Sequence, residues 1–207
     1  MNLFIYFVVL IFSVTVHEVA HGWVADKCGD PTARLHKRLT LNPLAHLDPV
    51  GSILIPFLVF LTHIPMPAWA KPVPVNFYNL RNPRADMMKV ALAGPMANIG
   101  LALISSIILR SGVVPQSTLL EHLLLCGVIA NFMLAIFNLL PIPPLDGSKI
   151  LMGILPPALS NKYAHLERFG FFILILFIGI GALDFVVRLA YYISYFGVGE
   201  RFFTFHL

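Results

Sequence analysis

The sequence predicts an all-α polytopic membrane protein with about four transmembrane helices and a re-entrant or short extended segment around residues 50–76. Of its 207 residues, 58% are apolar and only 12% are charged, whereas roughly a quarter of the residues in soluble domains are charged. The mean hydropathy is +0.83. A water-soluble globule is therefore excluded, and the length fits a single domain.

Four apolar blocks reach the length of about 20 residues that a bilayer-spanning helix needs. They cover residues 2–25, 87–109, 119–140 and 169–190. The first block lacks the basic start and small-residue cleavage site of a signal peptide, so we expect it to be retained. Pro141, Pro143 and Pro144 interrupt the chain just before Asp146, and irregular backbone at membrane depth is tolerated where it lines a cavity.

The apolar block at 50–64 is shorter and contains Pro56, which suggests a dip into the membrane rather than a crossing. If it returns to the side it left, the 14 basic residues divide 11 to 3 between the two sides. A full crossing would divide them 7 to 7. Because basic residues collect on the cytoplasmic side, the count favours the re-entrant arrangement with the N-terminus outside. Alternation around Pro74 indicates a short extended segment after it.

The net charge of +4 is explained by this topology. No basic cluster interleaved with aromatic residues is present, so we expect a lipid bilayer and no nucleic acid as a partner. The sequence indicates no particular oligomeric state.

The sequence HEVAH, from His17 to His21, matches an HExxH pattern inside the first apolar block. Positions i and i+4 share one helix face, so both imidazoles can reach one Zn²⁺ with Glu18 beside the water that the ion activates. An ionisable residue at the centre of a span costs about 2.5–3.5 kcal/mol, so three in one turn indicate a function. The alternative is a polar contact between helices. If the helix ends near Ala25, His17 and His21 lie about 12 and about 6 Å from its cytoplasmic end.

A catalytic zinc site takes three protein ligands, so a third must come from elsewhere in the chain. Most of the ten acids lie in loops or toward the outer face. Asp146 lies where the third span reaches the cytoplasmic side, at the depth of the two histidines, and is the candidate. His46 is a candidate for a residue that supports the site or lines the route to it, although loop histidines are commonly solvated.

Three motifs together resemble the site-2 protease family of intramembrane zinc metalloproteases: HEVAH, GPMAN at Gly94–Asn98 and NLLPIPPLDG at Asn138–Gly147. NPLAHLDPVGSILIP at 42–56 and WAKPVPVN at 69–76 resemble segments of small bacterial members. The resemblance implies one transmembrane metalloprotease domain over residues 1–207, without PDZ or CBS modules. It also implies a bacterial inner-membrane protein, and the division of basic residues places the expected active site toward the cytoplasm.

The resemblance further implies that His17, His21 and Asp146 bind Zn²⁺ and that Glu18 is the general base and acid. The expected reaction is hydrolysis of peptide bonds in transmembrane-helix substrates. A zinc transporter and a non-catalytic zinc-binding scaffold are the alternatives. Transport predicts polar sites across the bilayer and often a repeat, and neither is evident, while a scaffold has no need of Glu18.

Two asparagines complete what the resemblance implies. Asn98 and Asn138 are expected to hold the substrate or the oxyanion, because amide N–H groups near a metal can stabilise developing negative charge. Hydrogen bonding between helices is the alternative for both residues.

Overall fold

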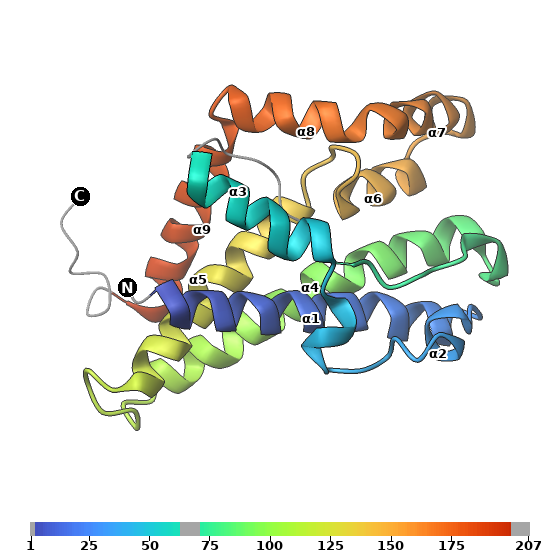
Figure 1. Cartoon of the computed structure of the whole chain (residues 1–207). Helices are drawn as coiled ribbons and strands as arrows, with labels where there is room; N and C mark the ends of the chain where they lie inside the picture. The colour runs from blue at the N-terminus through green and yellow to red at the C-terminus, as the bar shows by residue number, and fades with distance from the viewer. Residues whose placement is uncertain (1–2, 63–70, 200–207) are drawn as a thin grey trace.

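The computed structural model describes residues 3–62 and 71–199, and these residues form helices connected by turns and loops (Figure 1). The α-helices are α1 (Leu3–Lys27), α2 (Thr32–Leu35), α3 (Ile55–Thr62), α4 (Pro83–Arg110), α5 (Leu119–Asn138), α6 (Asp146–Ile154), α7 (Pro157–Ala164), α8 (Gly170–Gly179) and α9 (Ala182–Val198). A π-helix covers Pro49–Leu54, and 3₁₀ turns cover Pro43–His46, Phe77–Asn79 and His165–Phe169. The described residues contain no strand, so the predicted all-α class is confirmed.

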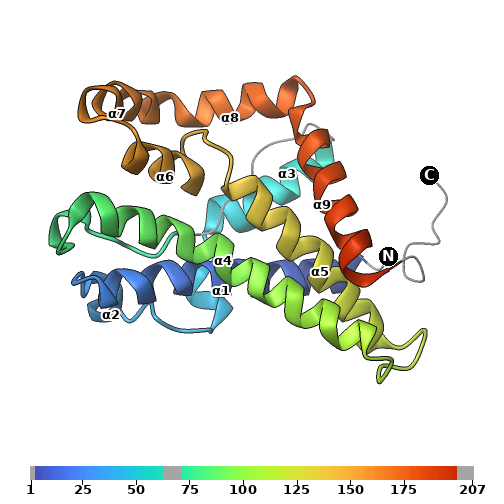
Figure 2. The same cartoon turned by 180° about the vertical axis from the view of Figure 1, so that it is seen from behind.

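Three helices are long and apolar enough to cross a membrane: α1, α4 and α5, with 24, 28 and 20 residues in their candidate spans. They correspond to the first three predicted spans. The three helices pack on one another, as both views show (Figures 1 and 2). This packed trio carries the residues that the sequence singled out.

The fourth predicted span, residues 169–190, is not one helix. The helix that includes α8 and the helix α9 meet at an angle of 73° and count as one span only as a bent pair. Gly181, between them, has φ +77°, a left-handed conformation that glycine adopts without a steric penalty. The apolar block continues through this bend, which is why hydropathy alone does not reveal it.

The block predicted to dip into the membrane forms the π-helix and α3, which have 6 and 8 residues. At 1.5 Å per residue they extend about 21 Å, too short for a hydrocarbon core of about 30 Å. Re-entry into the membrane stays a prediction. Residues 63–70, including Trp69 of the WAKPVPVN motif, lie outside the described residues. Residues 71–76 lie in neither a helix nor a strand.

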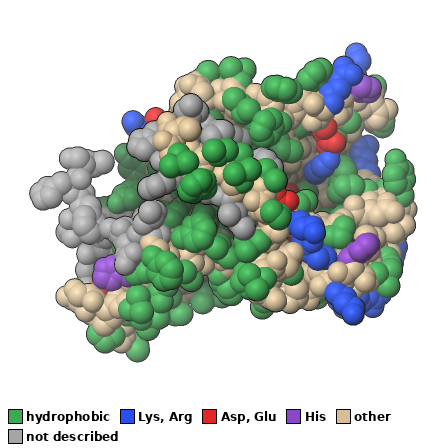
Figure 3. All heavy atoms as spheres, viewed as in Figure 1, with side chains coloured by type: hydrophobic (Ala, Val, Ile, Leu, Met, Phe, Trp, Pro, Cys, Tyr) green, Lys and Arg blue, Asp and Glu red, His purple; other side chains and the backbone are tan. Residues whose placement is uncertain are grey.

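The molecule has the polarity expected in lipid, with apolar side chains outside and polar ones inside. Phe172 and Phe196 are 70% and 75% exposed, and apolar side chains cover much of the surface in Figure 3. Ser13, Asn98 and Ser194 are buried. Lys and Arg side chains in Figure 3 gather mainly at the end of the molecule where α2 and α7 lie, as a membrane topology requires.

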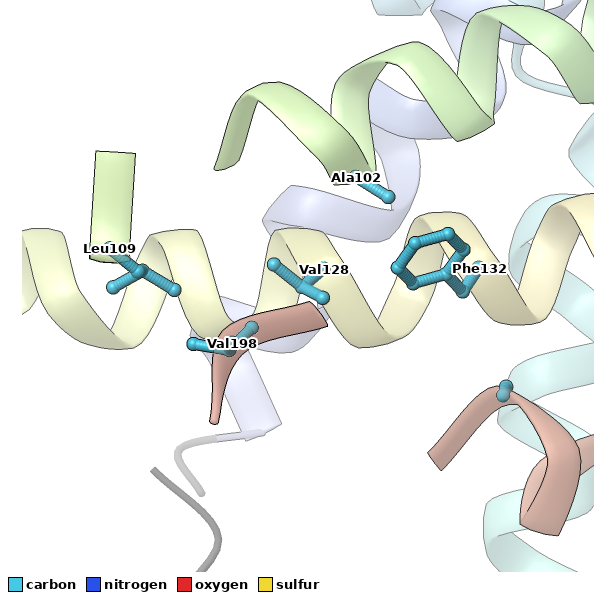
Figure 4. Close-up of a cluster of buried hydrophobic side chains, with 6 residues drawn as sticks. Ala102, Leu109, Val128, Phe132 and Val198 are labelled. Atoms are coloured by element: carbon cyan, nitrogen blue, oxygen red, sulfur yellow. The ribbon is translucent and has the colours of Figure 1, made fainter. Parts of the chain in front are cut away.

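A hydrophobic cluster holds α4, α5 and α9 together at the opposite end from α2 (Figure 4). Its buried members are Ala102, Leu109, Val128, Phe132, Ala190 and Val198. Small residues among them let the helix backbones approach closely, as is typical of membrane bundles. This cluster leaves the other end of α4 free to form the polar site.

Asp30, just after α1, ties residues 76–79 to the end of that helix. Its carboxylate is fully buried and accepts hydrogen bonds from Asn76 N (2.7 Å), Asn79 Nδ2 (3.0 Å), Thr32 N (3.2 Å) and Thr32 Oγ1. Burial raises the pKa of Asp30, but these hydrogen bonds outweigh burial and bring it below its ordinary value of 3.8. The ionised carboxylate therefore stabilises the fold.

We predict that Asp30→Asn lowers the free energy of unfolding by about 2–3 kcal/mol at neutral pH, because an amide cannot accept all of these bonds. Since the folded-state pKa is lowered, the stabilisation is present above pH 3.8 and is lost as the pH falls below it. Thermal unfolding in detergent at several pH values measures the difference. Asp184→Asn, at an exposed carboxylate, is the control and should change stability by less than about 0.5 kcal/mol. Equal stability of Asp30→Asn and wild type at neutral pH would contradict the assignment.

Candidate metal centre

Helix α1 places the imidazoles of His17 and His21 on one face, as the HExxH spacing predicts. Both residues are buried, at 6% and 9% exposure. Their ring centroids lie 4.6 Å apart and their Nε2 atoms 3.0 Å apart. The two nitrogens therefore point at a common position.

Asp146 joins them from the start of α6. Its Oδ2 atom lies 3.1 Å from His17 Nε2 and 3.2 Å from His21 Nε2. A tetrahedral Zn²⁺ with bonds of about 2.0–2.1 Å separates its ligand atoms by about 3.3–3.4 Å, so an ion fits after a slight expansion. Within the described residues, these three side chains form the one group of His, Cys, Asp and Glu arranged to hold a metal.

Hydrogen bonds on the far side of each ring fix which nitrogen faces Asp146. His17 Nδ1 lies 2.6 Å from Asn98 Oδ1, and His21 Nδ1 lies 2.7 Å from Val90 O. Both partners are acceptors only, so each Nδ1 is the donor and each neutral ring presents an unprotonated Nε2. The lone pairs of the two Nε2 atoms and of Asp146 Oδ2 then point at one another. They repel one another unless a cation lies between them, so the arrangement suits a metal ion.

One face of α4 serves both histidines. Val90, Gly94 and Asn98 recur every fourth residue, and α4 runs antiparallel to α1, so Asn98 meets His17 and Val90 meets His21. A Cβ on Gly94 would lie 2.4 Å from His21 Nε2 and 2.6 Å from His17 Nε2. Glycine at this position is therefore what gives the two imidazoles their space.

Asn98 lies behind His17 and does not line the cavity. It is fully buried, and its Nδ2 donates to Ser13 O (3.2 Å) and to Asn131 Oδ1 (2.7 Å). Asn131 Nδ2 in turn donates to Ser13 Oγ (2.9 Å) and Gly127 O (2.8 Å). This placement corresponds to the interhelical hydrogen bonding that the sequence left open. Sequence reasoning missed Asn131, whose signal is an amide within an apolar span.

The break between α5 and α6 places Asp146 beside the two histidines. Helix α5 ends at Asn138 and α6 begins at Asp146, as the prolines between them predict. A Cβ on Gly147 would lie 2.2 Å from Leu139 O and 2.3 Å from Leu140 O. Gly147 thus lets the start of α6 pack directly on the end of α5.

A cavity of about 310 Å³ opens onto the three candidate ligands. Glu18, Asn138 and Lys149 line it beside them, with apolar side chains on the remaining walls. Glu18 Oε2 accepts a hydrogen bond of 2.8 Å from Val73 N. Asn138 Nδ2 donates to Leu134 O (2.9 Å), and Lys149 pairs with Glu167. Val73 belongs to the WAKPVPVN motif and to the extended segment around Pro74, but its contact with Glu18 was not predicted, and Lys149 was not predicted as a site residue.

His46 is not brought to the ligands. It does not line the cavity, and it is not solvated either, because it is only 2% exposed. Its Nε2 lies 2.8 Å from Thr40 O, and its backbone oxygen accepts a hydrogen bond of 2.9 Å from Lys71 N. Its contacts therefore tie Thr40 and Lys71 to the 3₁₀ turn at Pro43–His46.

We predict that Gly94→Ala sharply reduces the metal bound per molecule, because the new methyl group occupies the space of both imidazoles. Gly100→Ala is the matched control, since Gly100 lies in the same helix and its Cβ would meet nothing within 4 Å. Elemental analysis of the purified proteins gives the metal-to-protein ratio. A full complement of metal in Gly94→Ala would refute this reading of the geometry.

We predict that Asn98→Leu weakens metal binding about 10- to 100-fold, because His17 loses the acceptor that orients its ring. Asn98→Asp keeps an acceptor and should bind more tightly than Asn98→Leu. Competition with a chelator of known affinity measures both. Equal affinities of Asn98→Leu and wild type would show that the hydrogen bond does not support the site.

Comparison with known proteins follows the same motifs. Residues 106–178 match the profile of peptidase family M50. A Bacillus subtilis protein named "Putative zinc metalloprotease YwhC" is 40% identical over 179 residues, which cover 83% of this chain and 78% of that protein. "Putative zinc metalloprotease Rip2" of Mycolicibacterium smegmatis is 29% identical over 175 residues, covering 84% of this chain and 66% of that protein. No solved structure matches significantly. The resemblance seen in the motifs is thus confirmed, and the chain belongs to peptidase family M50, the site-2 protease family of zinc metalloproteases.

Proposed function

We propose that this protein is an intramembrane zinc metalloprotease that hydrolyses peptide bonds in transmembrane segments of other proteins. The observation that carries the proposal is the convergence of His17, His21 and Asp146 on one position, with Glu18 lining the same cavity. All four side chains lie in or against a helix apolar enough to cross a membrane. Family membership supports the same chemistry.

The ligand set proposed for Zn²⁺ is His17, His21 and Asp146. Two imidazole nitrogens and one carboxylate oxygen are ordinary ligands of catalytic zinc, which keeps a further position for water or substrate. When bound, the ion would polarise the scissile carbonyl and lower the pKa of water toward 7. Asn98 and Val90 O keep the two rings oriented for this role.

Glu18 is proposed as general base and then general acid. It follows His17 directly in the helix, and its carboxylate lines the cavity that the ligands face. It would take the proton of the attacking water and deliver it to the leaving amine. Asn138 also lines the cavity, and beside its bond to Leu134 it has a second N–H to offer the substrate or the developing oxyanion.

The proposed reaction takes place below the membrane surface. Helix α1 ends at Lys27, so His17 and His21 lie about 15 and about 9 Å along the helix from that end. The clustering of basic residues supports a cytoplasmic location for this end and an outside N-terminus, in a bacterial inner membrane. The substrate segment must unwind locally, because an intact helix engages its carbonyls in hydrogen bonds.

The two alternatives have less support. Transport needs ion-binding groups distributed across the bilayer, whereas the described residues hold a single metal-type cluster, toward one end of α1. A non-catalytic scaffold would need the three ligands but not a carboxylate in the same cavity. Glu18 is therefore the residue that distinguishes a protease from a scaffold.

We predict that Glu18→Gln keeps the zinc content of the wild type but cleaves a reporter with a transmembrane segment about 10²- to 10⁴-fold more slowly, because the general base is lost. Cleavage is measured with purified protein in detergent and a reporter whose fragments are resolved on a gel. Glu121→Gln, in the first turn of α5 and distant from the site, is the matched control. Asp146→Ala should lose both zinc and cleavage. Cleavage by Glu18→Gln at the wild-type rate would rule out this mechanism, and zinc flux into proteoliposomes would point to transport.

A further inference from the structure

Residues 71–79, called here the 71–79 segment, pass along α1 beside the cavity and are anchored at both ends. The anchoring bonds are Lys71 N to His46 O (2.9 Å), Arg38 Nη2 to Lys71 O (2.9 Å), Asn76 N to Asp30 Oδ2 (2.7 Å) and Asn79 Nδ2 to Asp30 Oδ1 (3.0 Å). The segment has no strand partner among the described residues. Its position is thus set by contacts with α1 and the loops that flank α2.

Between these anchors, Val73 directs its backbone N–H at Glu18. The distance from Val73 N to Glu18 Oε2 is 2.8 Å, typical of a hydrogen bond to a carboxylate. Pro72 and Pro74 have no N–H, so Val73 carries the one amide donor of residues 72–74. The sequence Pro-Val-Pro therefore presents a single, isolated donor on an extended backbone, because proline restricts its own φ and the conformation of the residue before it.

Packing of the Val73 side chain against α1 holds this donor opposite the Glu18 carboxylate. The Val73 side chain is only 6% exposed, and a Cβ on Gly22 would lie 2.7 Å from Val73 Cγ1. Gly22 lies four residues after Glu18, so it occupies the same face of α1 one turn further along. Helix α1 therefore carries Glu18 and also packs against Val73, the residue that donates to Glu18.

We infer that the backbone amide of Val73 is a positioning group for the general base: it holds Glu18 Oε2 and leaves Oε1 to exchange protons with water and the leaving amine. A free carboxylate rotates about its terminal torsion with little preference. One fixed donor removes this freedom before the substrate binds, and small displacements of a catalytic group are costly to rate. This inference rests on the proposed proteolysis.

The test removes the donor and keeps the extended backbone. Val73→Pro eliminates the N–H, and Val73→Ala, which keeps the N–H but also loses the side chain that packs on Gly22, is the reference for the loss of packing. We expect Val73→Pro to bind as much zinc as Val73→Ala and to show a similar KM, but a kcat about 10²-fold lower. A purely structural role would lower zinc content and kcat together in both variants. Equal kcat values for the two variants would overturn the inference.

A second measurement needs no catalysis and decides the matter if Val73→Pro fails to fold or to bind zinc. In protein labelled with ¹⁵N-valine, the cross-peak that is missing from Val73→Ala identifies the Val73 amide. Glu18→Ala should move this cross-peak upfield and accelerate its hydrogen exchange, because the carboxylate acceptor is gone. An unchanged cross-peak would overturn the inference. Absence of cleavage by the wild type would instead refute the proposed function, while the cross-peak still reports on the contact.

Discussion

The structure depends on giving the Nδ1–H of each histidine at membrane depth a hydrogen-bond acceptor. A buried charge or polar group without a partner costs several kcal/mol. His17 Nδ1 therefore has Asn98, and His21 Nδ1 has Val90 O. These requirements fix how α4 lies against α1, because its acceptors must recur at the spacing of the histidines. The polar site thus determines the packing of the bundle as much as the bundle shapes the site.

Glycines make the same arrangement sterically possible. Gly94 admits the two imidazoles, Gly147 lets α6 reach the end of α5, and Gly22 seats Val73. In each case the atom that a Cβ would meet belongs to the site or to the backbone that supports it. Close approach between helices is the usual route to stability in lipid, where the hydrophobic effect does not drive helices together. Here Gly94 and Gly22 also make room for His17, His21 and Val73, which line the cavity.

The sequence predicted much of the fold and of the candidate site because the informative signals are local or strongly periodic. Apolar blocks located α1, α4 and α5, and the i, i+4 spacing placed both imidazoles on one face. Among the acids, Asp146 was predicted as the third ligand because its position in the sequence places it at the same membrane depth as the two histidines. The remaining features depend on which residues meet in three dimensions: Asn98 and Asn131 are 33 residues apart, and Val73 is 55 residues from Glu18. The bend at Gly181 lies inside a continuous apolar block, and hydropathy does not show a change of helix direction within such a block.

The two carboxylates that line the cavity also set its electrical balance. Asp146 and Glu18 carry two formal negative charges, the histidines with their protons on Nδ1 carry none, and the charge of Lys149 is balanced by its ion pair with Glu167. A bound divalent cation brings the sum to zero, whereas a monovalent ion leaves an excess negative charge and a trivalent ion an excess positive one. Because net charge is costly in a medium of low dielectric constant, the surroundings of the site themselves discriminate among ions by valence. Selectivity for a divalent ion would in this sense depend on the membrane-spanning fold as well as on the three proposed ligands.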